Sequence, residues 1–104
     1  MHEIHALMVA CYQFDAKPSR EDMQSAHSSV WPGVQNLLLS ARALGLGAVL
    51  TSYSLTDYDA FVKVLDLPED MGAFALIPVG YPLGKFGPVT RLPASEVMRF
   101  DRWS

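Results

Sequence analysis

The sequence predicts a single domain of the α/β (α+β) class, in which a mixed sheet packs on a buried central helix. Short apolar segments of strand length alternate with helical patterns, an order typical of folds that layer helices on a sheet. Residues 30–52 also contain only one charged side chain, that of Arg42, so we expect the helix in this stretch to be largely buried.

A strand and a short polar helix open the expected domain. Residues 4–14 are continuously apolar and end at a polar turn, which is typical of a strand buried on both faces. Residues 19–29 are polar and favour a helix. Ser19 is its expected N-cap, and Asp22 lies at the position that completes a capping box.

The central helix is expected to follow. Pro32 fits its first turn, where the missing N–H group has no helical partner to lose, and Gly45 suits the left-handed position just after its end. Apolar side chains recur on one face and also lie opposite, so we expect burial nearly all round. The first face carries Val34, Leu37, Leu38, Ala41 and Leu44, and the second carries Leu39 and Ala43.

Two strands and a helix complete the expected domain. Residues 48–52 form a strand that ends in hydroxyl side chains, and residues 58–66 form an amphipathic helix. Residues 73–82 form the last strand. Pro78 has no N–H group to donate to a neighbouring strand, so we expect a bulge or a sheet edge there.

The last segment, residues 83–104, is expected to be an arm that docks on another surface. It mixes glycine, proline and basic residues and ends in the large apolar side chains of Phe100 and Trp103. Half of the 104 residues are hydrophobic and only 18% are charged, which is apolar for so small a domain. Both features indicate an oligomer or part of a larger fold.

Composition narrows the classes of function. The formal net charge is -3 and the basic residues are scattered, which argues against nucleic acid or an anionic membrane as a partner. Cys11 is the only cysteine, so no internal disulfide can form, and its apolar neighbours favour an inert thiol. No segment has the length of a membrane span and the first residues lack a basic leader region, so we expect a cytoplasmic location.

Metal sites and hydrolytic triads have little support. His2 and His5 open a strand without other ligands nearby, so no metal site is expected. No nucleophile elbow is present, and the Gly-Leu-Gly at residues 45–47 ends a helix, whereas a dinucleotide-binding loop opens one. We therefore expect no catalytic side chain and no metal ligand.

Several separated motifs resemble the nitroreductase family of FMN-dependent oxidoreductases. The family's central helix carries the pattern Gln-Asn-Leu-x-Leu-x-Ala-Arg-x-x-Gly-Leu-Gly, which residues 35–47 match closely, and its Gly-Tyr-Pro strand end is matched at residues 80–82. A downstream motif is matched by Arg91, Glu96, Val97 and Trp103. The chain thus resembles roughly the C-terminal half of the family fold, from Leu7 onward.

The resemblance implies an enzyme in which NAD(P)H delivers hydride to FMN, and the flavin passes it to a nitro compound, a quinone or a similar acceptor. It also implies a homodimer with the flavin at the subunit interface. It assigns contact with the flavin ring to the backbone N–H groups of Leu50, Thr51, Ser52 and Tyr53, and phosphate binding to Arg91. An ordinary polar turn and a solvated arginine are the alternatives at these positions.

One part of the family pattern has no counterpart here. Family members begin with helices that carry an arginine-rich FMN motif, and Arg20 lies in a different context. The chain is then a truncated relative, one piece of a split enzyme, or a relative that has lost flavin binding. The alternative function is a non-catalytic nitroreductase-like scaffold that acts by self-association or partner binding. The sequence names neither the electron acceptor nor the choice between NADH and NADPH.

Overall fold

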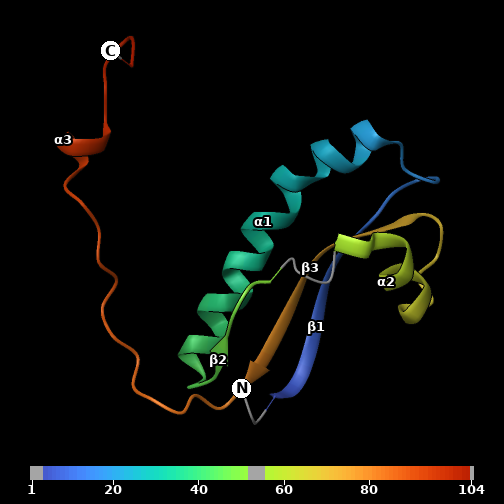
Figure 1. Cartoon of the computed structure of the whole chain (residues 1–104), viewed down its shortest axis with the longest axis horizontal. Helices are drawn as coiled ribbons and strands as arrows, with labels where there is room; N and C mark the ends of the chain where they lie inside the picture. The colour runs from blue at the N-terminus through green and yellow to red at the C-terminus, as the bar shows by residue number, and fades with distance from the viewer. Residues whose placement is uncertain (1–3, 52–55, 104) are drawn as a thin grey trace.

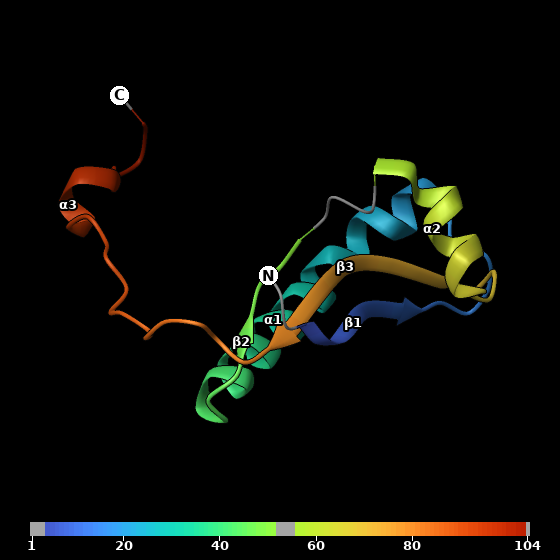
Figure 2. The same ribbon diagram turned by 60° about the horizontal axis from the view of Figure 1, so that its bottom comes forward.

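The computed structural model describes residues 4–51 and 56–103, and it confirms the predicted combination of helices and a sheet (Figure 1). The elements in chain order are β1 (Ile4–Gln13), α1 (Arg20–Ala43), β2 (Gly47–Ala48), α2 (Tyr58–Leu65), β3 (Met71–Gly80) and α3 (Ala94–Val97). The long helix α1 lies against one face of the sheet (Figure 2). We refer to residues 4–80 as the body and keep the name arm for residues 83–104.

The sheet has the strand order β1-β3-β2, and each described pair of strands is antiparallel. The central strand β3 carries most of the core, whereas β1 lies at an edge and exposes side chains such as Leu7, which is 60% exposed. The prediction that the first strand is buried on both faces is therefore wrong. Helix α1 covers one face of β1, and no described element covers the other.

Pro78 lies in the central strand, so the expectation of a sheet edge is wrong. The alternative expectation, a bulged strand, is met by the pairing of β3 with β1, whose register shifts between Ala10 and Cys11. Its carbonyl accepts a hydrogen bond from the Val49 N–H at 3.4 Å. The N–H and C=O of a strand residue point to the same side, so the missing donor of Pro78 also faces β2. Pairing on that side is split between β2 and an isolated bridge that joins Thr51 to Leu76. Pro78 is therefore tolerated because its missing N–H group falls where the hydrogen-bond ladder between β2 and β3 is already interrupted.

Helix α1 begins at the predicted cap but runs further than predicted. The Ser19 hydroxyl accepts from the Asp22 N–H at 3.1 Å, and the Asp22 carboxylate accepts from the Ser19 N–H at 2.9 Å. The helix continues through the exposed Pro32, so the expectation of a second helix that starts there is wrong. Gly45 has a φ of 78°, which confirms its predicted left-handed conformation after the helix end.

Only one face of α1 is buried, because one small sheet covers it. Its buried side chains pack on β3, and His27 meets the Phe74 ring edge-on with centroids 5.0 Å apart. On the opposite side Leu39 is 57% exposed, and Leu44, the C-cap residue just after the helix, is 77% exposed. The prediction that the central helix is buried nearly all round is therefore wrong for the single chain. The core residues of α1 are Ala26, Val30, Val34 and Ala41.

The arm leaves the body after β3 and extends away from it (Figures 1 and 2). Residues 83–103 are exposed throughout, including Phe100 at 81% and Trp103 at 74%. The arm contacts the body where the Arg42 guanidinium carbon lies 3.9 Å from the centroid of the Phe86 ring. The docking of the arm on another surface stays a prediction.

Candidate functional site

Leu50 and Thr51 lie at the edge of the sheet, just beyond β2. The Thr51 N–H donates to the Leu76 carbonyl at 3.0 Å, and the Leu76 N–H donates back at the same distance. Alternate residues of an extended chain direct their backbone groups to opposite sides, so those of Leu50 point away from β3. Among the described residues, none accepts a hydrogen bond from the Leu50 N–H. The edge therefore offers a backbone donor at Leu50, whereas that of Thr51 is used within the sheet.

The surroundings of this donor are apolar and accessible. Val49 and Leu50 are 48% and 41% exposed, and the neighbouring strand residues Leu76 and Pro78 are partly buried. A directed N–H group amid apolar surface is the combination that holds a planar, uncharged ring with acceptor atoms at its rim. Ser52 and Tyr53, which the sequence assigns to the same loop, lie outside the described residues.

Arg91 belongs to the arm, and within one chain the arm extends away from the strand β2, beyond which Leu50 and Thr51 lie (Figure 1). Its guanidinium donates to the carbonyl of the neighbouring residue Thr90 at 2.9 Å, and the side chain is exposed. No carboxylate of the described residues pairs with it. Its remaining donors are therefore accessible to an anion that reaches the arm.

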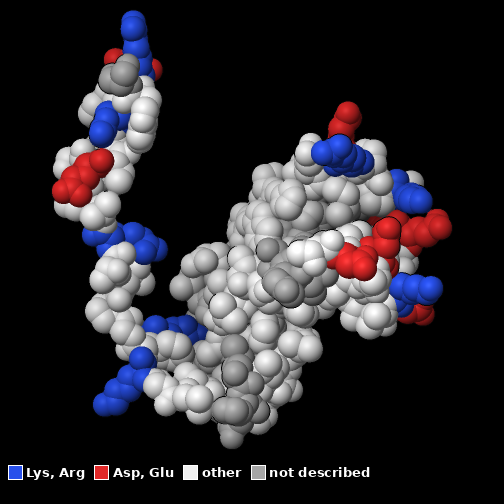
Figure 3. Space-filling model, in the orientation of Figure 1, with Lys and Arg blue, Asp and Glu red and all other residues white. Residues whose placement is uncertain are grey.

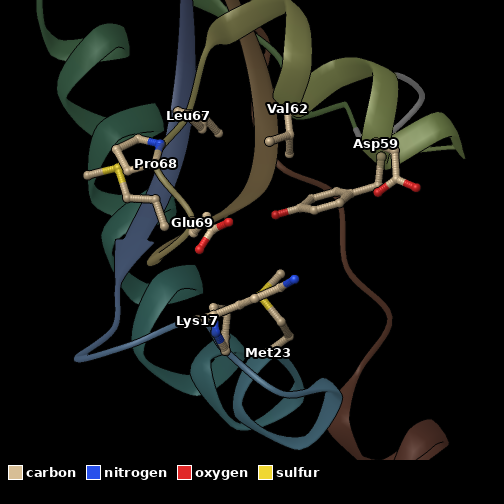
Figure 4. Close-up of a pocket in the computed structure, with 10 residues that line it drawn as sticks. Lys17, Met23, Asp59, Val62, Leu67, Pro68 and Glu69 are labelled. Carbon is tan, nitrogen blue, oxygen red and sulfur yellow. The ribbon is translucent and has the colours of Figure 1, made fainter.

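A second feature, at the far end of the body, has no counterpart among the predicted sites. A hollow of about 280 Å³ lies between the start of α1, helix α2 and the loop that leads to β3 (Figure 4). We name it the end hollow. Its lining residues are Lys17, Pro18, Met23, Tyr58, Asp59, Val62, Leu67, Pro68, Glu69 and Met71.

The end hollow combines an apolar interior with unpaired charges. The Tyr58 hydroxyl accepts from the Ala73 N–H at 2.9 Å, which ties α2 to the central strand beside the hollow. Lys17, Asp59 and Glu69 are exposed and form no ion pair with another described residue. Sequence reasoning missed this site because its residues come from separate segments that only the fold brings together.

Cys11 lines a third feature, an apolar hollow of about 300 Å³ between β1 and α1. Partial burial raises the pKa of the Cys11 thiol above its ordinary value of 9.0. The thiol is therefore protonated at neutral pH, as expected of an unreactive side chain.

Residues 4–51 and 56–103 contain neither a cluster of metal-binding side chains nor a helix that could span a membrane. No three His, Cys, Asp or Glu side chains in these ranges gather where they could hold a metal ion. None of the helices there is both long and apolar enough to cross a lipid bilayer.

Comparison with known proteins identifies the family. The model of the nitroreductase family matches residues 1–81, which is most of the chain. This chain belongs to the nitroreductase family. The resemblance noted in the sequence motifs is therefore confirmed.

Curated relatives share substantial identity with parts of the chain. A protein of Methanothermobacter thermautotrophicus, named as an NADH dehydrogenase/NAD(P)H nitroreductase, is 46% identical over 50 residues. That match covers 46% of this chain and 26% of the relative. The iodotyrosine deiodinase of Thermotoga neapolitana is 31% identical over 80 residues, which are 77% of this chain and 40% of the relative.

Solved structures of nitroreductases match nearly the whole chain. Two proteins named as NADH dehydrogenase/NAD(P)H nitroreductases, from Bacteroides thetaiotaomicron and Parabacteroides distasonis, superpose with TM-scores of 0.65 and 0.66 at 27% and 31% identity. Each match covers 93% of this chain but only 55% of the other. The chain thus spans about half of the solved nitroreductases and less of the curated relatives.

Proposed function

We propose that the protein is an FMN-dependent oxidoreductase that takes hydride from NAD(P)H and delivers it to a nitro compound, a quinone or a similar acceptor. Membership of the nitroreductase family supports this reaction class. The observation in the structure that carries the proposal is the unpartnered Leu50 N–H on an apolar edge of the sheet. Bound FMN would accept and return the hydride, so the chain itself needs no acid or base.

In this proposal the residues of the chain bind and orient. The Leu50 N–H donates a hydrogen bond to the rim of the ring, and the paired hydrogen bonds between Thr51 and Leu76 hold that donor in place. The family resemblance assigns the same contact to Ser52 and Tyr53, which lie outside the described residues. Arg91 grips the phosphate through its forked guanidinium, which suits a planar set of oxygen atoms.

We further propose a homodimer in which the arm of one copy supplies Arg91 to the sheet edge of the other. This arrangement would unite residues that one chain keeps apart. It would also cover apolar side chains that the single chain exposes, such as Leu39 on α1 and Leu44 at its C-cap.

The test is FMN binding followed by turnover. The purified protein is titrated with FMN while flavin fluorescence and sedimentation are recorded, and NAD(P)H oxidation is then followed with a nitroaromatic or a quinone. Stoichiometric binding with acceptor-dependent NAD(P)H oxidation supports the proposal. A folded protein that leaves the fluorescence of FMN unchanged contradicts it.

The second candidate is a non-catalytic scaffold, which one observation favours. Within one copy the arm, which carries Arg91, extends away from the sheet edge that carries Leu50 and Thr51 (Figure 1). A colourless protein that ignores added FMN yet forms a stable oligomer would support this candidate over the enzyme.

A further inference from the structure

We propose that the end hollow binds a free amino acid with a large apolar side chain. The hollow shares no lining residue with the sheet edge at Leu50 and Thr51, so the inference stands apart from the proposed oxidoreductase. It rests on the apolar interior of the hollow, on the hydrogen bonds that hold its walls and on the unpaired charges of both signs at its rim.

The interior of the hollow is lined by apolar side chains from three separate segments. Met23 lies in the first turn of α1, Val62 lies on α2 and Leu67 lies in the loop before β3, and each is only partly buried. A ligand side chain that fills the volume of about 280 Å³ removes this apolar surface from water, which favours binding roughly in proportion to the area covered. Methionine adapts its shape to such an occupant. The interior therefore selects a side chain of several carbon atoms over a small or polar one.

Two hydrogen bonds hold the walls of the hollow in place. The Tyr58 hydroxyl accepts from the Ala73 N–H at 2.9 Å, which fixes α2 to the central strand. The Met71 N–H donates to the Pro68 carbonyl at 3.1 Å and closes the turn that carries Glu69. Because these contacts are made without a ligand, little further ordering is needed when one binds.

The rim of the hollow carries charged groups of both signs. Figure 4 shows Lys17, from the segment before α1, and Glu69, from the loop before β3, with their side chains directed toward the open space, while Asp59 lies on α2. Among the described residues, none forms an ion pair with these three groups. Figure 3 shows further charges of both signs over this end of the body, and two of the basic ones, Arg20 and Lys63, do not line the hollow.

A ligand with a single charge meets a like charge at this rim. A simple carboxylic acid can pair with Lys17 but faces two carboxylates, and a simple amine can pair with Glu69 but faces the lysine. The zwitterionic head group of an amino acid satisfies both, because its carboxylate pairs with the Lys17 ammonium group and its own ammonium group pairs with Glu69. The charges at the rim and the apolar surface inside therefore favour the same class of ligand.

Binding of L-leucine tests the inference. We expect saturable changes in the amide NMR shifts of residues that line the hollow, such as Met23, Val62 and Leu67, and no comparable change at Leu50 and Thr51. L-Alanine has the same head group but less apolar surface, so it should bind at least about tenfold more weakly. The same titration with FMN present should give the same Kd, because the two sites share no residue.

Two substitutions separate the roles of the rim charges. Lys17→Ala removes the partner of the ligand carboxylate, and Glu69→Gln removes the charge that faces the ligand ammonium group. Each should weaken L-leucine binding about three- to fivefold, as expected for an exposed ion pair. Isoamylamine, which is leucine without its carboxylate, should lose no affinity in Lys17→Ala. Isocaproate, which is leucine without its ammonium group, should lose none in Glu69→Gln.

The matched controls remove exposed charges at the same end of the body but outside the hollow. Lys63→Ala is the control for Lys17→Ala, and Glu21→Gln is the control for Glu69→Gln. Each should leave the Kd for L-leucine within about 1.5-fold of the unaltered protein, since only the general charge changes. Circular dichroism confirms that every variant is folded.

Three results would overturn the inference. They are the absence of saturable shifts at the hollow, binding of L-alanine as tight as that of L-leucine, and rim variants that bind no more weakly than their controls. FMN titration of the same samples keeps the two proposals apart. A chain that binds L-leucine but ignores FMN contradicts only the oxidoreductase, and one that binds FMN but not L-leucine contradicts only the amino acid site.

Discussion

The Arg42 guanidinium carbon lies 3.9 Å from the centroid of the Phe86 ring, which joins the last turn of α1 to the first part of the arm. Phe86 is 41% exposed, and a cation–π pair at such a site contributes about 0.5–1 kcal/mol. This contribution is enough to favour one position for the first residues of the arm, but it is too small to fix the position of the whole arm.

Replacing Phe86 by Ala should therefore loosen the arm without weakening the body. We expect amide hydrogen exchange at residues 83–90 to rise about two- to fivefold, while the melting temperature is unchanged. Leu83→Ala, at a residue that is 84% exposed, is the control and should alter neither. Equal exchange in Phe86→Ala and the unaltered chain would show that the ring does not restrain the arm.

The capping box at the start of α1 is expected to contribute measurably to stability. Ser19→Ala removes the acceptor of the Asp22 N–H and should lower the free energy of unfolding by about 1 kcal/mol. Ser25→Ala is the matched control, because that hydroxyl only donates to a helical carbonyl, and it should be close to neutral. Urea denaturation followed by circular dichroism compares them. Equal losses in both would mean that the cap is not stabilising.

Local signals in the sequence predicted the ends of α1 but not its continuity. Ser19 and Gly45 act through hydrogen bonds and backbone conformation within a few residues, so sequence alone located them. The passage of the helix through Pro32 depends on tertiary packing. Ala26, Val30 and Val34 keep one buried face on both sides of the proline, and β3 covers that face. Packing of this kind outweighs a single lost hydrogen bond.

For the candidate site, too, the sequence predicted the residues involved but not which of their backbone groups are accessible. Family motifs assigned Leu50 and Thr51 to the flavin, and the structure places them at an open sheet edge. Which of the two amides is available depends on the register with Leu76, and that is fixed only in the folded sheet. The end hollow had no local signal at all, because Lys17, Met23 and Glu69 belong to segments with no shared motif.

Cys11 should make stability depend on pH in the alkaline range. Burial raises the pKa of its thiol in the folded state, so the unfolded chain loses this proton first as pH rises. The stabilisation from the protonated thiol is complete below the pKa of the unfolded thiol. It is lost as the pH rises from there through the higher pKa of the folded thiol. Urea denaturation at a series of pH values should therefore show a steeper alkaline loss for the unaltered protein than for Cys11→Ala. Parallel curves would show that the buried thiol is not responsible.

Arg91 is expected to bind phosphate while contributing little to folding. Its only described hydrogen bond is to the adjacent Thr90 carbonyl, so Arg91→Ala should change the free energy of unfolding by less than about 0.5 kcal/mol. Loss of a charged donor pair should weaken FMN binding about tenfold or more. Arg91→Lys keeps the positive charge but lacks the two parallel N–H donors of the guanidinium. Its FMN affinity should therefore lie between that of the unaltered protein and that of Arg91→Ala. Isothermal titration gives the affinities, and an FMN affinity unchanged in Arg91→Ala would remove phosphate binding from this residue.

Leu50 gives the sharpest test of the flavin edge, because the proposed contact is a backbone N–H that one substitution deletes. Proline at this position lacks the donor, and an edge residue whose N–H faces outward tolerates proline. We expect Leu50→Pro to weaken FMN binding about five- to tenfold. Leu50→Ala shortens the side chain but keeps the N–H, so it should stay within about twofold of the unaltered protein. Comparing Leu50→Pro with Leu50→Ala therefore separates the effect of losing the backbone N–H from the effect of shortening the side chain. If both variants bind FMN equally well, the Leu50 amide is not the donor, and the flavin edge must be sought elsewhere on the sheet.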